Sequence, residues 1–110
     1  MYSKEWVIAG GLTDMIKKHR LCITKNDYEL RQVGCSLANT FGKRGYGFFE
    51  TIYHQAKGDA QNEAKLFYAG CLLAGNKISF ATLVYYAHQA GIIRNYYTLT
   101  YQNDFMFLNY

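Results

Sequence analysis

The segment at positions 26–42 constrains the fold most, because it carries signals for the start, the buried face and the end of one helix. Asn26 stands three residues before Glu29, the spacing of a capping box in which the cap side chain accepts a free backbone N–H. Apolar residues then recur at the helical period, at Leu30, Val33, Leu37 and Phe41. Gly42 follows as a helix stop. The segment therefore predicts an amphipathic helix.

Glycine and capping residues punctuate the rest of the chain, which contains no proline. They predict four more helices, at positions 7–20, 45–56, 60–74 and 80–90, the last with Ser79 as its N-cap. Short connections favour antiparallel neighbours, so the expected fold class is all-α, a compact bundle of about five helices. The side chains expected in its core are Leu30, Val33, Leu37, Phe41, Phe49, Phe67, Leu83 and Val84.

The C-terminal segment at positions 92–110 differs in character, because it holds six aromatic side chains and only two charged ones. Positions 98–101 alternate and positions 102–104 have turn chemistry, so a small hairpin is one expectation and an extended aromatic tail is another. Because the segment is so rich in aromatic residues, we expect it to pack against the bundle or against a second copy of the chain in a homodimer. The expected organisation is an N-terminal helix region (1–25), a helical bundle (26–91) and this tail, in one structural domain.

Composition bounds the class of protein. A chain of 110 residues leaves no room for a second core, and a hydrophobic content of 50% excludes wholesale disorder. No apolar run reaches the roughly 18 to 20 residues of a membrane span, and the N-terminus lacks the pattern of a signal peptide. The cysteines at positions 22, 35 and 71 form no CxxC motif and cannot all pair. We therefore expect a reduced, cytoplasmic protein without membrane contact.

Catalytic signatures are absent from the sequence. Gly42 and Lys43 are followed by Arg44, so no P-loop is present, and neither GxSxG nor HExxH occurs. The acidic residues are too scattered to form a magnesium-binding cluster. Cys35 and Cys71 lie in or beside apolar stripes, where a free cysteine acts as a small hydrophobic residue. We expect no catalytic residue, no metal, no cofactor and no enzymatic activity in this chain.

The loop at positions 41–47 carries the sharpest functional signal, because it combines three glycines, two cations and the aromatic Tyr46 at the start of a predicted helix. N–H groups at a helix start attract phosphate, Lys43 and Arg44 add positive charge, and Tyr46 offers a face for base stacking. The alternative is that the glycines serve only the turn and that the cations are solvated. With a net charge of +4, the candidate nucleic-acid-binding residues are Lys43, Arg44, Tyr46, Lys57 and Lys77.

Three stretches, at positions 26–37, 41–50 and 78–91, carry a family resemblance. They resemble the second type of helical domain found C-terminal to the catalytic core in primases of phages, plasmids and other mobile elements. Positions 26–37 look like its opening helix, with an Asp-Tyr start and a Val-Gly-x-x-Leu step. Positions 41–50 are similar to its glycine-spaced turn into a Phe-rich helix, and positions 78–91 to its last helix, with an Ala-x-x-Ala-Gly ending. The chain departs from the family at two usual tryptophan positions, where Leu30 and the pair at 66–67 stand.

The resemblance covers positions 26–91 and implies a non-catalytic accessory domain, one that helps a primase or primase–helicase engage single-stranded template and nucleotide. The implied partners are single-stranded DNA and the primase catalytic core, a helicase domain or both. Because the loop offers few phosphate contacts, we expect the DNA to be bound weakly and without sequence preference. In the alternative, the chain is a protein–protein docking or dimerisation module that links primase to helicase. Phosphate binding weakens steeply with salt, whereas an apolar interface does not, so salt dependence separates the two.

Overall fold

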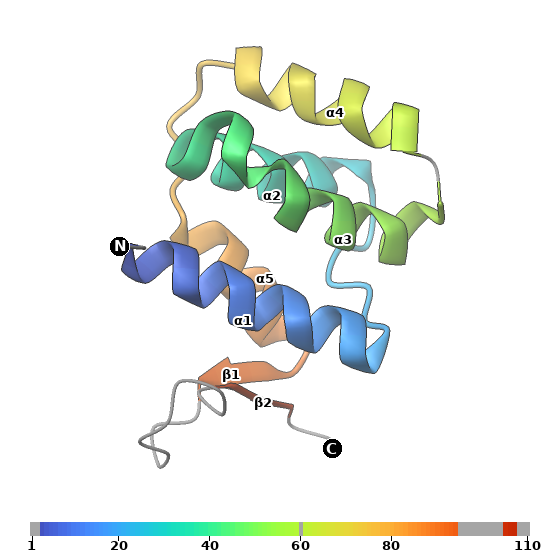
Figure 1. The fold of residues 1–110 in the computed structure, drawn as a ribbon, viewed down its shortest axis with the longest axis vertical. Coiled ribbons are helices and arrows are strands. Elements are labelled where there is room, and N and C mark those ends of the chain that lie inside the picture. The colour runs from blue at the N-terminus through green and yellow to red at the C-terminus, as the bar shows by residue number, and fades with distance from the viewer. Residues whose placement is uncertain (1–2, 60, 95–104, 108–110) are drawn as a thin grey trace.

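The computed structural model describes residues 3–59, 61–94 and 105–107. Within them the chain forms five α-helices: α1 (Lys4–His19), α2 (Asp27–Phe41), α3 (Tyr46–Lys57), α4 (Gln61–Leu73) and α5 (Ala81–Gln89) (Figure 1). The remaining elements are the 3-10 turn η1 (Gly42–Gly45), between α2 and α3, and the short strands β1 (Ile92–Arg94) and β2 (Phe105–Phe107). The expected all-α compact bundle is confirmed.

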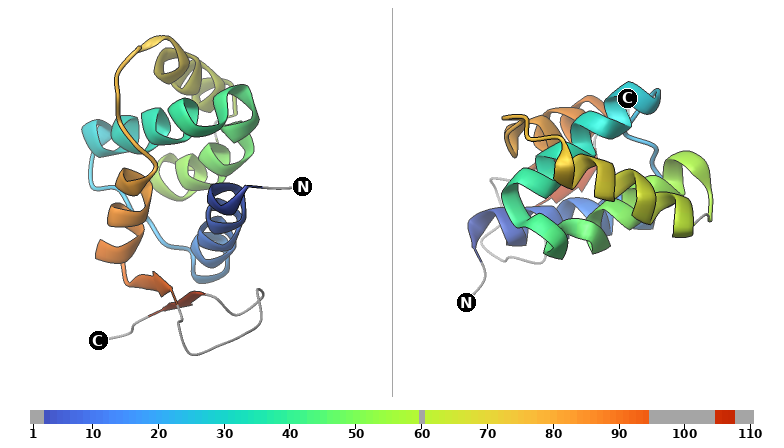
Figure 2. Two further views of the ribbon diagram at one scale, coloured as in Figure 1. Left: turned by 90° about the vertical axis from the view of Figure 1, so that its left-hand side faces the viewer. Right: turned by 90° about the horizontal axis from the view of Figure 1, so that it is seen from above.

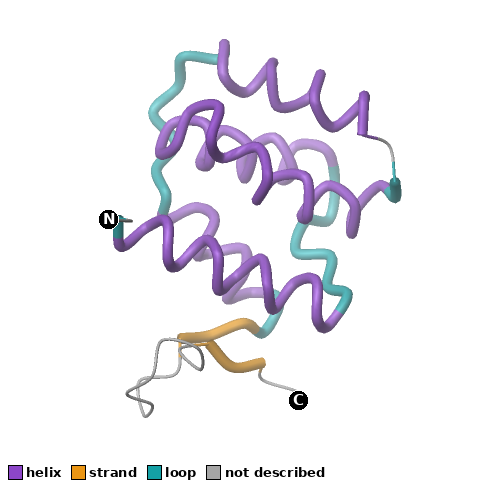
Figure 3. The backbone as a smooth tube through the Cα atoms, in the orientation of Figure 1, coloured by secondary structure: helices purple, strands orange, loops and turns teal. Residues whose placement is uncertain are grey.

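The helices stack in three layers. α2 and α3 form the middle layer, with α4 on one side and α1 and α5 on the other (Figure 1). The turned views keep this order (Figure 2). The strand pair lies beyond α1 and α5, on the side away from α4 (Figure 3). Because α2 contacts α3, α4 and α5, positions 33–38 are all buried, and α2 is the central helix of the bundle.

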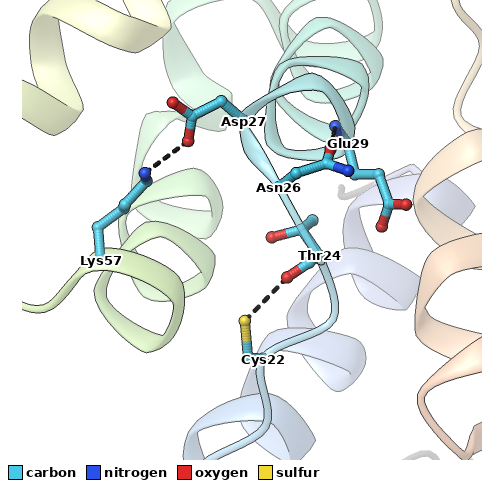
Figure 4. Close-up of polar contacts among 6 residues, drawn as sticks. All are labelled: Cys22, Thr24, Asn26, Asp27, Glu29 and Lys57. Atoms are coloured by element: carbon cyan, nitrogen blue, oxygen red, sulfur yellow. Dashed lines mark hydrogen bonds and ion pairs between the residues drawn. The ribbon is translucent and has the colours of Figure 1, made fainter.

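Polar side chains mark the starts of the first two helices. The Ser3 Oγ accepts the Trp6 N–H over 3.1 Å, and α1 begins at position 4 rather than at the expected position 7. The Asn26 Oδ1 accepts the Glu29 N–H over 2.9 Å, which confirms the predicted cap of α2 (Figure 4). The Glu29 carboxylate in return accepts the Lys25 N–H over 2.9 Å. These bonds satisfy backbone donors that have no partner within the helix.

The expected cap of the last helix is wrong. α5 begins after Phe80, which occupies the N-cap position, and no side-chain hydrogen bond caps it. Ser79 contributes its backbone carbonyl instead, which accepts the Thr82 N–H over 3.1 Å. The Phe80 ring packs against Phe41 with the ring centroids 5.8 Å apart. Tertiary packing therefore positions this helix start, in place of a capping hydroxyl.

Most of the expected core is confirmed. The fully buried members are Leu30, Val33, Leu37, Phe49 and Leu83. Phe41 and Phe67 are only partly buried, although both pack against the core. Val84 is 39% exposed, so the expectation that it belongs to the core is wrong. The buried residues of α5 are Leu83 and Ala87, four positions apart on one helix face, and Val84 lies off that face.

The two strands near the C-terminus pair antiparallel, with Ile92 opposite Phe107 and Arg94 opposite Phe105. β2 also contacts α1, so for these residues the expected packing of the tail against the bundle is found. The positions expected to form a hairpin strand and turn, 98–104, lie outside the described residues. Among the helices that the structure describes, none combines the length and apolar character needed to cross a membrane.

Candidate nucleic-acid interface

The loop at positions 41–47 forms η1 and the start of α3. Some of its backbone N–H groups already donate hydrogen bonds within the protein. Gly42 ends α2 with a φ of 62°, a conformation that favours glycine, and its N–H donates to the Ala38 carbonyl. The Tyr46 N–H, at the start of α3, donates to the Lys43 carbonyl. A helix start binds phosphate through free N–H groups, so the turn itself uses some of the donors expected there.

Tyr68, on α4, holds this turn against the bundle. Its hydroxyl donates a hydrogen bond to the Gly42 carbonyl over 2.6 Å, and burial raises the pKa of the phenol above its ordinary value. Gly45 packs beside it, because a Cβ placed there would lie 2.5 Å from the Tyr68 Oη and 3.1 Å from the Leu37 carbonyl oxygen. The φ of −75° at position 45 suits any residue, so backbone conformation does not require glycine there. Glycine is required because a larger side chain would not fit in the space.

The two cations of the turn are exposed to solvent. Both Lys43 and Arg44 are exposed residues of η1. The Arg44 Cζ lies over the Trp6 ring, 4.9 Å from the ring centroid, which is within the roughly 6 Å reach of a cation–π interaction. The first turn of α1 thus brings an aromatic face to a cation that lies far along the chain.

Trp6 belongs to a group of four rings that we call the aromatic corner: Trp6, Phe41, Phe48 and Phe80. The Trp6 centroid lies 5.2 Å from that of Phe41 and 4.7 Å from that of Phe48, both edge to face. All four residues are partly buried, so the corner both joins helices and reaches the surface. Sequence reasoning missed it, because the rings come from four separate segments and no local periodicity connects them.

Tyr46, which was expected to offer a face for base stacking, is partly buried and has partners within the protein. Its hydroxyl donates to the Glu50 Oε2 over 3.0 Å, and its ring lies edge to face with Tyr68 at a centroid distance of 5.8 Å. Burial raises the pKa of the Tyr46 phenol, and the hydrogen bond and charge of Glu50 add to that shift. Within the described residues, the geometry instead puts Trp6 beside an exposed cation.

Lys77 belongs to the connection between α4 and α5. That connection runs at the same end of the bundle as the turn between α2 and α3 (Figure 1). The Asn39 side chain, near the end of α2, donates to the Asn76 and Ile78 carbonyls, each over 3.0 Å. These bonds hold the connection beside the last turn of α2. We call the exposed cations of η1 and of this connection the basic edge: Lys43, Arg44 and Lys77.

Lys57 lies away from the basic edge. It is the last residue of α3, so the length of that helix separates it from η1. Its Nζ forms an ion pair with the Asp27 Oδ1, at the start of α2 (Figure 4). The hydrogen bond and charge of Asp27 raise the pKa of the Lys57 ammonium group. The structure therefore pairs Lys57 with a carboxylate and does not bring it together with the other candidate residues.

The three cysteines are free thiols, two of them buried and one exposed. Within the described residues, no three His, Cys, Asp or Glu side chains gather as metal ligands would. Cys35 and Cys71 are buried, and burial raises the pKa of the Cys71 thiol to about 12, with a further contribution from Cys35. A thiol so rarely ionised is a poor nucleophile and a poor metal ligand. The exposed Cys22 donates its S–H to the Thr24 carbonyl over 3.0 Å (Figure 4).

Comparisons with protein-family models, with curated proteins and with solved structures return no match to this chain. We therefore interpret the site from its own chemistry. It offers three exposed cations at one end of a bundle, one of them lying over an indole ring. Positive charge next to aromatic surface is the combination that single-stranded nucleic acids engage through phosphates and bases.

Proposed function

We propose that this chain is a non-catalytic accessory helical domain of a mobile-element DNA primase, and that it assists engagement of the single-stranded template. The observation that carries the DNA-binding part is the basic edge, because three candidate cations from two separate connections lie at one end of the bundle. The sequence resemblance over positions 26–91 supports the primase context. The chemistry of primer synthesis would belong to the catalytic core, which is the implied partner.

The expected mode of binding is electrostatic and independent of base sequence. Each cation of the basic edge can neutralise one phosphate and release a counterion, and phosphate contacts carry no direct information on base sequence. Three phosphate contacts support only weak binding, in the micromolar range or above. Such affinity suits a domain that adds template contacts to those of a larger protein, because linked weak sites reinforce one another.

The test is fluorescence anisotropy of a labelled oligothymidylate, measured with the full chain across a salt series. The Lys43→Ala/Arg44→Ala double variant should bind more weakly, and its salt slope should be flatter by roughly 0.7 to 1 unit per lost contact. Lys77→Ala should flatten the slope by one such step. Lys57→Ala is the matched control, since it removes the same charge at the opposite end of α3 and should leave the slope unchanged.

Two results would contradict the proposal. Absence of binding even at low salt would remove the DNA-binding role from this chain. A Lys57→Ala variant that flattens the slope as much as Lys77→Ala would show that binding follows net charge alone, without a defined edge.

A second candidate function, protein–protein docking, is favoured by the outer face of α4. Leu66 is 74% exposed and Leu73 is 87% exposed, with the exposed Ala69 and Gly70 between them. The pattern Leu-x-x-Ala-Gly-x-x-Leu at positions 66–73 reads nearly the same from either end. If a second copy of α4 packed antiparallel to the first, Leu66 of each copy would therefore lie beside Leu73 of the other in a two-fold interface. An apolar strip of this kind is typical of an interaction surface.

Sedimentation velocity over a range of protein concentrations tests this second function. The unmodified chain should dimerise as concentration rises, and a Leu66→Ser/Leu73→Ser variant should remain monomeric. A chain that stays monomeric at every concentration would exclude a second copy as the occupant of this face.

A further inference from the structure

We propose that Trp6 is a positioning residue for phosphate binding, because it holds the Arg44 guanidinium in place to contact the DNA backbone. This inference rests on the proposed function and deepens it. It assigns a role to a residue outside the stretch that resembles primase domains, and it adds α1 to the interface. The juxtaposition that carries it is Arg44 over the Trp6 ring, with the Cζ 4.9 Å from the ring centroid.

Contacts within the described residues hold the Trp6 backbone and ring in place. Its backbone N–H is bonded to the Ser3 Oγ in the first turn of α1, over 3.1 Å. Its ring packs against Phe41, the last residue of α2, and Phe48, in the first turn of α3, at centroid distances of 5.2 and 4.7 Å. A ring fixed by the ends of three helices is a rigid support for a flexible side chain.

Arg44 is an exposed residue on a short turn, and a free arginine there would lose considerable side-chain entropy on binding phosphate. Contact with the indole face restricts the guanidinium before the DNA arrives. A guanidinium that lies over a ring keeps edge N–H donors for a phosphate, and arginine can donate two parallel bonds to it. Among the ion pairs of the described residues, none engages Arg44, so none of these ion pairs has to break when the guanidinium contacts a phosphate.

Lys43, the neighbouring cation, provides the internal comparison. It is exposed on the same turn but has no described ring contact, so it acts as a freely moving point charge. The two cations should therefore differ in their dependence on Trp6. Removing the indole should weaken the contribution of Arg44 and leave that of Lys43 intact.

The experiment is the same oligothymidylate salt series, extended to Trp6→Ala, Arg44→Ala, Lys43→Ala and the double variants of Trp6 with each cation. Trp6→Ala should weaken binding by about two- to five-fold, although it removes no charge. Its salt slope should move toward that of Arg44→Ala, since a phosphate contact is lost. The Trp6→Ala/Arg44→Ala variant should bind like Arg44→Ala alone. The effects of Trp6→Ala and Lys43→Ala should instead add.

The salt slope separates positioning from a merely structural role, because loss of packing lowers the melting temperature without changing the number of phosphates that the folded chain neutralises. Trp6→Phe provides a second variant, which keeps an aromatic ring between Phe41 and Phe48 but has a weaker attraction for a cation. Its affinity for the oligothymidylate should lie between that of the unmodified chain and that of the Trp6→Ala variant. If Trp6→Ala does not fold, Trp6→Phe decides the question.

The failures of the two proposals are distinguishable. If the unmodified chain does not bind the oligonucleotide at low salt, the proposed function fails and this inference fails with it. If the unmodified chain binds, but folded Trp6 variants keep its affinity and salt slope, the inference alone is overturned. Strictly additive losses in Trp6→Ala/Arg44→Ala would also overturn it, because they would show that the indole and the guanidinium act independently.

Discussion

The Tyr68 hydroxyl donates to the Gly42 carbonyl over 2.6 Å, a bond that joins the middle of α4 to the turn that ends α2. It satisfies a carbonyl at a helix end, where the regular hydrogen-bond pattern stops. The same hydroxyl is the atom that a Cβ at Gly45 would approach most closely. The shape of η1, and with it the placement of Lys43 and Arg44, therefore depends on a tyrosine from another helix.

Gly45→Ala should destabilise the fold, because the new methyl group would meet the Tyr68 Oη and the Leu37 carbonyl oxygen. We expect a loss of about 1 to 3 kcal/mol, measured as the free energy of unfolding in urea. Gly47→Ala is the matched control: nothing lies within 4 Å of its Cβ, so it should be neutral or stabilising by up to about 1 kcal/mol. Equal losses from the two substitutions would refute the packing role of Gly45.

Leu37→Ala should cost about 2 to 5 kcal/mol of folding free energy, because Leu37 is fully buried on the central helix and its removal leaves a cavity. Asn26→Ala should cost only about 1 kcal/mol, through the lost hydrogen bond to the Glu29 N–H. Chemical denaturation of both variants checks the difference. Coincident midpoints would contradict the assignment of core and cap.

Ser36→Ala should stabilise the protein. The Ser36 Oγ is buried on α2 and has no hydrogen-bond partner among the described residues, so its desolvation is uncompensated. Alanine also has the higher helix propensity. We expect a gain of about 1 kcal/mol in urea denaturation, whereas Ser79→Ala, at an exposed position outside the helices, should change little. A Ser36→Ala variant less stable than the unmodified chain would disprove this account.

Stability should fall as pH rises above about 9, where a thiol ordinarily ionises. Burial raises the pKa of Cys71 to about 12 and also raises that of Tyr68, so the folded state keeps protons that the unfolded chain releases. The unfolded state then binds fewer protons, and the stability present below pH 9 is progressively lost toward pH 12. Urea midpoints at several alkaline pH values measure this.

Cys71→Ala should lessen the decline in stability between pH 9 and 10, whatever its cost at neutral pH. Cys22→Ala is its control, because it removes a thiol from an exposed position. If both variants keep the slope of the unmodified chain, the buried thiol is not its source.

The sequence predicted those parts of the fold that local signals determine. The start and the buried face of α2 follow from Asn26 and the spacing of the apolar residues, all within the same helix. Val84 was misplaced because it neighbours Leu83 and both are apolar, so only the packing of α5 decides which of them is buried. The start of α5 was misplaced for a similar reason, since Phe80 packs against Phe41 there.

The candidate site was only partly predictable. Composition and turn chemistry picked out Lys43, Arg44 and Lys77, but their placement at one end follows from the long-range bonds of Asn39. The contact between Trp6 and Arg44 has no local signal at all, because it depends on how α1 lies against the end of α2. Tertiary packing, which no short window of sequence encodes, assembles the aromatic corner.

The direct succession of α2, η1 and α3 bears on the order in which the fold forms. Pairing α2 with α3 closes a very short loop at little cost in chain entropy, whereas the bonds from Gly42 to Tyr68 and from Asn39 to Asn76 span 26 and 37 positions. The α2–α3 pair should therefore form early, so that Leu37→Ala slows folding while Leu83→Ala mainly speeds unfolding. The basic edge is completed only when the connection to α5 docks.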